Sequence, residues 1–131
     1  MASIYREINI DVDAEYAWAE LRCFEAAAEL FPGVLIDCRR TGDVREVTFA
    51  GGSKLIEQLV TRDDSRRRIV YTVRHEAYTH HSASMQVLPD SAGCRFLWVS
   101  DFLPEERRGT MEPLIDAGCQ ALKRYFECRK P

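Results

Sequence analysis

The sequence predicts an α+β domain in which a curved antiparallel sheet of about seven strands wraps around one long C-terminal helix. Three observations predict this class. Short segments of alternating apolar and polar residues follow one another, tight turns separate them, and a single long amphipathic segment comes last. Only that segment is long enough to cover one face of such a sheet. Side chains or a ligand must therefore fill the space left between sheet and helix.

The N-terminal part predicts one strand followed by two short helices. Residues 3–11 alternate between apolar and polar side chains with period two, which is typical of a strand. Asp13 suits the N-cap of a helix over residues 14–21. A second short helix is expected over residues 24–30, because Pro32 and the glycine after it end the helical pattern.

Six further strands are predicted in quick succession, each bounded by turn residues. Their ranges are 34–40, 44–50, 54–62, 68–76, 80–88 and 94–103. The pair Gly51-Gly52 is typical of a two-residue hairpin turn. Short strands joined by tight turns favour an antiparallel meander.

The last predicted element is an amphipathic helix more than four turns long. Its apolar stripe recurs at steps of three and four residues and comprises Met111, Leu114, Ile115, Gly118, Leu122, Tyr125 and Phe126. Pro113 marks either the start of this helix or a kink in it. Since no linker, repeat or low-complexity tract interrupts the chain, residues 1–131 are expected to form a single domain.

Composition disfavours several classes of function. The chain has 131 residues, 46% of them hydrophobic and 30% charged, with a formal net charge of -3. Basic residues are interleaved with acidic ones, so no nucleic-acid partner is expected. No apolar run approaches the ~20 residues of a membrane span, so no stable membrane insertion is expected. Five scattered cysteines and no secretory leader indicate reduced thiols and a cytoplasmic location.

Three stretches carry a resemblance to a known family. Residues 8–18 contain I-D-V-D-A-E-x-A-W, residues 42–71 contain G-D-V-R-x-V-x-F-x-G-G and E-x-L-V-x-x-D-D, and residues 96–104 read F-x-W-x-S-x-F-x-P. In these stretches and in element order the chain resembles the START-like, helix-grip superfamily, in particular its polyketide cyclase/dehydrase and lipid-transport (SRPBCC) branch. The resemblance implies a ligand pocket under the last helix. Members of the superfamily carry lipids, bind plant hormones or cyclise polyketides, so the fold does not decide the function.

Glu57 and Tyr71 are candidates for catalysis or ligand binding, and both match residues of the family patterns. Alternation places Glu57 on an apolar face with Leu55. A carboxylate there is a candidate general acid or base, because loss of water favours its protonated form. The alternative is a carboxylate that pairs with a cross-strand arginine such as Arg45 or binds water. The hydroxyl of Tyr71 either donates to a ligand oxygen or is satisfied locally.

His81 is the third candidate for catalysis. Alternation places His81 inside the predicted sheet and His80 outside, and a shift of one residue would exchange them. His75 and His81 could approach each other if their strands pair. No metal-binding spacing accompanies these histidines, so neither a metal nor any other cofactor is expected.

The walls of the expected pocket are apolar residues of five elements. They are Leu55, Val73, Met85, Trp98, Phe102, Met111 and Ile115. Ser100 shares a face with Trp98 and could offer one hydrogen bond to a ligand. Gly118 either leaves room for that ligand or lets the helix approach the sheet.

The leading functional hypothesis is binding or transport of a small hydrophobic molecule, lipid-like or aromatic. The first alternative is a cyclase/dehydratase-type enzyme, in which Glu57 or His81 abstracts a proton next to a carbonyl and Tyr71 polarises the oxygen. The second alternative is a stress- or protein-interaction module with a vestigial pocket. The sequence leaves the oligomeric state open, a dimer included.

Overall fold

The computed structural model describes residues 2–129 and contains one antiparallel sheet. Its seven strands lie in the order β1-β7-β6-β5-β4-β3-β2. Their bounds are β1 Ser3–Ile10, β2 Leu35–Thr41, β3 Val44–Phe49, β4 Lys54–Asp63, β5 Arg68–Arg74, β6 His80–Asp90 and β7 Gly93–Leu103. Each strand pairs with its neighbour in the sequence except β1, which returns to pair with β7.

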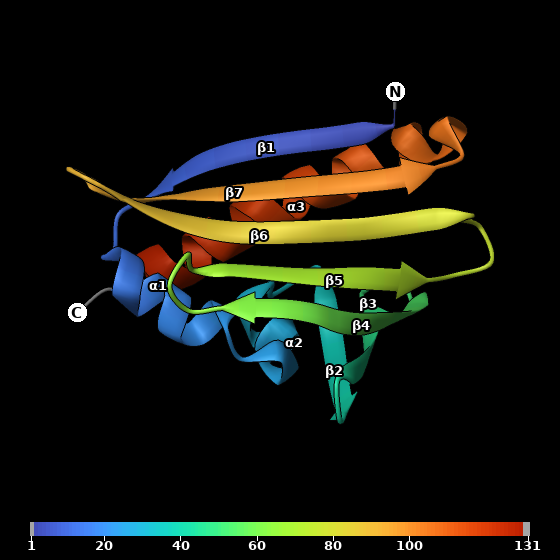
Figure 1. The fold of residues 1–131 in the computed structure, drawn as a ribbon, viewed down its shortest axis with the longest axis horizontal. Helices are drawn as coiled ribbons and strands as arrows, with labels where there is room; N and C mark the ends of the chain where they lie inside the picture. The colour runs from blue at the N-terminus through green and yellow to red at the C-terminus, as the bar shows by residue number, and fades with distance from the viewer. Residues whose placement is uncertain (1, 130–131) are drawn as a thin grey trace.

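The helices confirm the predicted order of elements. They are α1 Ala14–Leu21, the 3-10 turn η1 Phe24–Ala26, α2 Ala27–Leu30, the 3-10 turn η2 Glu105–Arg107 and the long helix α3 Arg108–Glu127. Figure 1 shows α3 lying along one face of the sheet behind β1, β7 and β6. At the other end α2 packs against β2, and α1 contacts β6 and β7. The predicted fold class is therefore confirmed.

Two irregularities bend the far half of the sheet. The β2–β3 register shifts between Leu35 and Asp37, and the β4–β5 register shifts between Leu59 and Thr61. The extra residues at these bulges, Ile36 and Val60, are 62% and 58% exposed. A bulge bends its strand and increases the local twist. In Figure 1, β2 and β3 turn away from the direction of β5, β6 and β7, so the sheet curves around the space in front of α3.

Large side chains from the sheet, the helices and the turn η1 form the buried core. The largest fully buried ones include Phe24, Phe96, Phe102, Leu122 and Phe126. Burial of a side chain of this size contributes about 1.5–3 kcal/mol relative to exposure. The thiols of Cys94 and Cys119 lie in this core, and burial raises the pKa of each to about 11. Both therefore act as small apolar side chains.

Local details differ from the prediction at two turns. The loop between β3 and β4 has four residues, 50–53, instead of the two-residue turn expected at Gly51-Gly52. A hydrogen bond from the Phe49 N–H to the Ser53 carbonyl closes it, and Gly52 takes a φ of 97°. The strand predicted over residues 68–76 ends at Arg74, so His75 lies outside the sheet and is exposed.

The helix ends also differ in detail. Asp13 occupies the N-cap of α1 as predicted, but its side chain makes no capping hydrogen bond in the described structure. Helix α3 begins at Arg108, so Pro113 lies inside it, in the second turn. Leu114 lies at the edge of the apolar stripe and is 41% exposed. Between residues 2 and 129, no helix combines the length and the apolar character that crossing a membrane requires.

Replacement of Gly93 by alanine should destabilise the fold by about 2 kcal/mol or more. Gly93 has a φ of 133°, and a Cβ there would lie 2.5 Å from the carbonyl oxygen of Ile10. Equilibrium urea unfolding measures the free-energy change. Gly51→Ala is the matched control, since its Cβ would meet nothing within 4 Å in the described structure. Equal stability of the two variants would contradict this account of the close approach.

Candidate functional site

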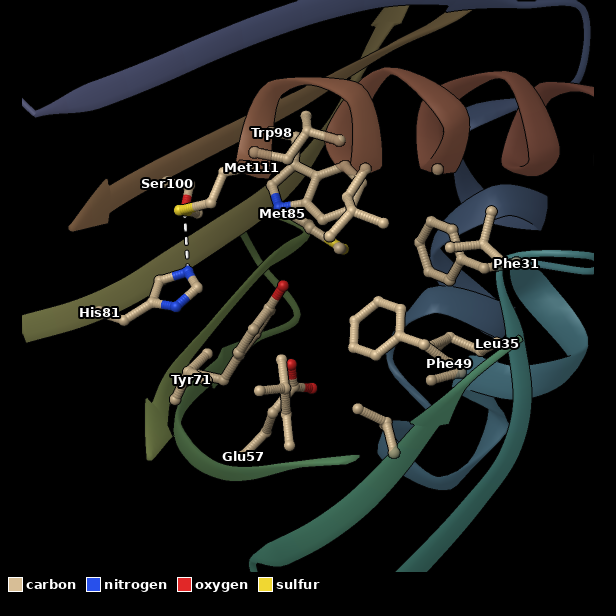
Figure 2. Close-up of a pocket in the computed structure, with 18 of the residues that line it drawn as sticks. Phe31, Leu35, Phe49, Glu57, Tyr71, His81, Met85, Trp98, Ser100 and Met111 are labelled. Carbon is tan, nitrogen blue, oxygen red and sulfur yellow. Dashed lines mark hydrogen bonds between the residues drawn. The ribbon is translucent and has the colours of Figure 1, made fainter. Parts of the chain in front are cut away.

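A cavity of about 100 Å³ lies between the curved sheet and α3. Strands β3 to β7 form its floor and sides, α3 covers it, and the segment from α2 into β2 closes one end. Figure 2 shows side chains from these elements directed into the same space. The volume exceeds that of a single water molecule several-fold, so the interior is not a fully packed core.

The cavity brings together all but one of the residues predicted to line the pocket. These are Leu55, Glu57, Tyr71, Val73, His81, Met85, Trp98, Ser100, Met111 and Ile115. Phe102 is the exception. It is 1% exposed and belongs to the core beside the cavity, with the Arg108 guanidinium 5.6 Å from the centre of its ring. Alternation along the strands predicted eight of these residues, and the helical spacing of the last element predicted Met111 and Ile115.

Several lining residues were not predicted. They are Ala27, Phe31, Val34, Leu35, Arg45, Val47, Phe49, Tyr78 and Leu114. Most come from the α2–β2 segment and the β2–β3 hairpin, which the sequence left without a position relative to the helix. Arg45, Val47 and Phe49 alternate along β3, so their shared face was visible in the sequence. What the sequence lacked was a reason to direct that face toward α3.

Arg45 and Glu57 form a buried ion pair at the floor of the cavity. The two residues are direct partners in the β3–β4 register. Arg45 donates from Nε to Glu57 Oε1 at 2.8 Å, and Nη2 lies 2.7 Å from the same oxygen. Each side chain is only 9% exposed. The predicted alternative for Glu57, pairing with Arg45, is therefore the arrangement found.

The rest of the Arg45 guanidinium is also occupied. Its Nη1 donates to the Phe24 carbonyl at 2.7 Å, which joins β3 to the turn η1. Its central carbon lies 3.9 Å from the centre of the Phe24 ring and 5.2 Å from that of Tyr71. A planar guanidinium satisfies a carboxylate and stacks on rings at the same time. The opposite charges of Arg45 and Glu57 thus balance each other, and these contacts hold the guanidinium in place.

His81 lies at the other end of the cavity and is mostly shielded from solvent, while His80 is exposed. His81 Nε2 and Ser100 Oγ lie 3.1 Å apart. The ring of Tyr78 packs against the imidazole with centroids 4.8 Å apart. Loss of water on burial, helped by the nearby His80, lowers the pKa of His81 to about 4. The imidazole is therefore neutral at pH 7.

Two further polar groups face the interior. The Tyr71 side chain is buried, and loss of water together with the nearby Glu57 carboxylate raises the pKa of its phenol well above the usual value. The indole nitrogen of Trp98 is buried, and no atom of residues 2–129 accepts a hydrogen bond from it. Figure 2 shows the Tyr71 hydroxyl and the Trp98 nitrogen directed toward each other across the cavity.

The described part of the chain offers no metal centre. Within residues 2–129, no three histidine, cysteine, aspartate or glutamate side chains are grouped to hold a metal ion. His75 lies outside the cavity, where its Nδ1 accepts a hydrogen bond from the Ala77 N–H. The expected approach of His75 to His81 does not bring both imidazoles to one site.

Sequence comparison supports the resemblance noted above. The chain matches the family described as polyketide cyclase / dehydrase and lipid transport over residues 1–127. It belongs to this family. A search of curated proteins found no match. The family covers both ligand carriers and enzymes, so membership confirms the architecture and a role in ligand binding or cyclase-type chemistry without choosing between them.

Several solved structures share the fold of this family member. A protein from Thermobifida fusca is 28% identical, with 99% of this chain and 97% of that chain covered and a TM-score of 0.79. A protein from Bacillus thuringiensis is 20% identical, with 96% and 99% covered and a TM-score of 0.87. Norcoclaurine synthase from Thalictrum flavum, in complex with dopamine and hydroxybenzaldehyde, is 17% identical, with 98% and 88% covered and a TM-score of 0.75.

Removal of Arg45 should be among the most destabilising single changes in the cavity. Arg45→Met leaves the Glu57 carboxylate buried without its partner, which costs about 3 kcal/mol of unfolding free energy. The double variant Arg45→Met, Glu57→Leu should recover most of that loss, since no charge then remains buried. Chemical denaturation of Arg45→Met, Glu57→Leu and the double variant gives the coupling energy.

A surface ion pair provides the control for that measurement. Arg95 lies 2.8 Å from Glu7, and both side chains are far more exposed than Arg45 and Glu57. Arg95→Met should cost less than about 1 kcal/mol. A double variant at the buried pair that is as unstable as Arg45→Met would show that the loss comes from packing and not from the unpaired charge.

His81 should make the stability of the protein depend on pH. The unfolded histidine has a pKa near 6.5 and the folded one about 4. Between these values the unfolded chain binds a proton that the folded chain does not, so stability falls as pH decreases from about 6.5 to 4. His81→Gln should flatten this slope in urea unfolding curves. His80→Gln should reduce the slope only slightly, because His80 contributes less than burial does to the lowered pKa of His81. An equal effect of both variants would exclude His81 as the main source.

Proposed function

We propose that this protein binds a small, mainly apolar molecule with an aromatic ring in the cavity under α3. One observation carries the proposal. The wall of the cavity is mostly apolar and carries a few polar side chains, among them Tyr71, His81 and Trp98. Within residues 2–129, neither His81 Nδ1 nor Trp98 Nε1 has a hydrogen-bond partner. A mostly apolar pocket with a few convergent polar groups is the usual form of a small-molecule site.

Aromatic side chains support the choice of an aromatic ligand over a flexible chain. Phe31, Phe49, Tyr71, Tyr78 and Trp98 all line the cavity. Flat rings stack on such surfaces with little loss of conformational freedom. Norcoclaurine synthase, which shares the fold, holds the aromatic molecules dopamine and hydroxybenzaldehyde in its structure. The compact cavity volume also favours one or two fused rings over a long acyl chain.

The roles of the polar residues follow from their partners. Glu57 is occupied by Arg45, so in this proposal it fixes the floor of the cavity instead of abstracting a proton. Tyr71, His81 and Trp98 remain the polar side chains that contact the ligand directly. Ser100 orients the His81 ring through the contact between Ser100 Oγ and His81 Nε2.

An enzyme of the cyclase/dehydratase type is the second candidate. The position of His81 favours it, because its imidazole lines the same cavity as the Tyr71 hydroxyl and is neutral at pH 7. With a pKa of about 4 it is a weak base, so the proton must come from a strongly activated carbon. In this reaction His81 takes a proton from a carbon next to a carbonyl, and the Tyr71 hydroxyl donates a hydrogen bond to the oxygen on which negative charge develops. In the cyclisation, the carbanion adds to a second carbonyl carbon, and the alkoxide that forms takes the proton back from His81. In the dehydration, the hydroxyl on the neighbouring carbon leaves as water with that same proton.

Native mass spectrometry of the protein purified without denaturation is the first test. A retained small molecule, identified by solvent extraction, would support binding and reveal its chemical class. The opposite result has two parts: the purified protein carries no adduct, and its mass does not shift when fatty acids, flavonoids or polyketide mimics are added. This result would favour the vestigial-pocket hypothesis. A compound that is consumed in the presence of the protein, but not of the His81→Ala variant, would favour the enzyme.

Filling the cavity should abolish binding without unfolding the protein. Leu55→Trp places an indole in the cavity, where Leu55 forms part of the wall. We expect at least a tenfold loss of affinity for whichever compound the mass spectrometric screen identifies, measured by isothermal titration calorimetry. Val60→Trp on the same strand is the control, because Val60 is 58% exposed and lies outside the cavity. Undiminished binding by Leu55→Trp would place the ligand elsewhere.

A further inference from the structure

The indole N–H of Trp98 is the least explained polar group of the cavity. A buried hydrogen-bond donor without a partner costs about 1–3 kcal/mol relative to one that is satisfied. The Nε1 atom of Trp98 is shielded from solvent, yet none of the described residues 2–129 accepts its hydrogen. The second tryptophan behaves normally, since Trp18 Nε1 donates to Asp64 Oδ1 at 2.9 Å.

A close contact with α3 fixes the position of the Trp98 ring. A Cβ placed on Gly118 would lie 2.7 Å from Cζ3 of Trp98, which is closer than Cβ atoms approach other groups in proteins, and 3.1 Å from Cη2. Only glycine at this helical position leaves room for the six-membered ring. The ring of Phe31 lies 5.6 Å away and that of Phe96 lies 6.2 Å away, centroid to centroid. Helix and rings together hold the nitrogen edge of the indole toward the cavity (Figure 2).

The hydroxyl of Tyr71 faces the same part of the cavity. It is protonated at neutral pH, because burial raises its pKa, and it can therefore donate. The Trp98 N–H is near enough to the Tyr71 oxygen to oppose, in small part, the rise in the pKa of the phenol. The two groups nevertheless do not form a hydrogen bond of normal geometry. An oxygen atom between them could accept from both donors. Charge argues against an anion there, since the Arg45 guanidinium is already occupied by Glu57 and the Phe24 carbonyl.

We infer that Trp98 Nε1–H and Tyr71 O–H form a two-donor site for an uncharged carbonyl oxygen of the ligand, and that Gly118 is the positioning residue that makes the indole available. The inference rests on the proposed binding function and adds the group that the ligand must carry. A ligand amine is disfavoured because its N–H groups are donors, and they would face the two donors of the protein instead of accepting from them. A carboxylate would bring an uncompensated charge into an apolar cavity that already contains Glu57.

A matched pair of probes tests this inference on the intact protein. 2-Acetylnaphthalene and 2-ethylnaphthalene have nearly the same shape, but only the first has a carbonyl. We expect the ketone to bind about fivefold more tightly, the effect of one net hydrogen bond. In ¹H–¹⁵N spectra of the wild-type protein, the Trp98 indole signal should move downfield with the ketone and much less with the hydrocarbon. The Trp18 signal serves as the internal reference.

Variants separate the two donors from the apolar wall. Trp98→Phe and Tyr71→Phe should each reduce the preference for the ketone to twofold or less, while 2-ethylnaphthalene keeps its affinity within about threefold. Gly118→Ala should shift the Trp98 indole signal in the ligand-free protein and reduce the ketone preference. Gly109→Ala in the same helix should do neither, because its Cβ would meet no described atom within 4 Å.

The outcomes distinguish the inference from the proposed function. Equal affinity for ketone and hydrocarbon in the wild-type protein, or an unmoved Trp98 signal, overturns the two-donor site while binding itself stands. Failure of both probes to bind, together with an adduct-free native mass, overturns both. The wild-type spectra alone decide the inference if Trp98→Phe does not fold.

Discussion

A single helix has to cover one face of a seven-stranded sheet, and the rest of the structure depends on this constraint. Helix α3 has 20 residues, which corresponds to about 30 Å of length but only about 10 Å of width. Seven strands spaced about 4.8 Å apart span a similar length across the sheet, so one helix leaves much of the face uncovered. The bulges at Ile36 and Val60 bend the far strands, and α2 closes the open end. The cavity is the volume that this closure does not fill.

The buried pair of Arg45 and Glu57 determines the shape of that volume. Desolvating two charges is costly, and a pair of this kind contributes less to stability than apolar residues of the same size could. Its three hydrogen-bonding contacts instead join β3, β4 and η1 at one point. Stacking of the guanidinium between Phe24 and Tyr71 then fixes the ring that carries the Tyr71 hydroxyl. The pair therefore stabilises the fold less than apolar residues could, but it holds the side chains at the cavity floor in one arrangement.

The sequence predicted the features that depend on the alternation of side chains within one strand. It failed where the outcome depends on how two strands pair. Alternation placed His81 inside and His80 outside, and it brought Tyr71, Met85 and Trp98 to one face. It could not show that Ile36 and Val60 are inserted residues, because a bulge appears only when two strands are compared. Phe31, Leu35 and Phe49 were missed because the sequence does not show where the α2–β2 segment and the β2–β3 hairpin lie relative to the long helix. Glu57 was ambiguous in the sequence, since a carboxylate on an apolar face fits both a free base and a bound partner, and only the β3–β4 register decides.

Two unfavourable features meet at the contact between Gly118 and Trp98, and each alone would have a structural explanation. A mid-helix glycine costs up to about 1 kcal/mol relative to alanine, and close helix packing can require it. An unsatisfied indole N–H costs more, and a rotation of the ring toward another acceptor could remove it. Here the glycine admits the indole in the position that leaves its N–H without a protein partner. Packing alone would favour the opposite choice, with alanine at 118 and an apolar ring at 98. Features that reduce stability at one contact, and that open toward a cavity, are more consistent with selection for a ligand than for the fold.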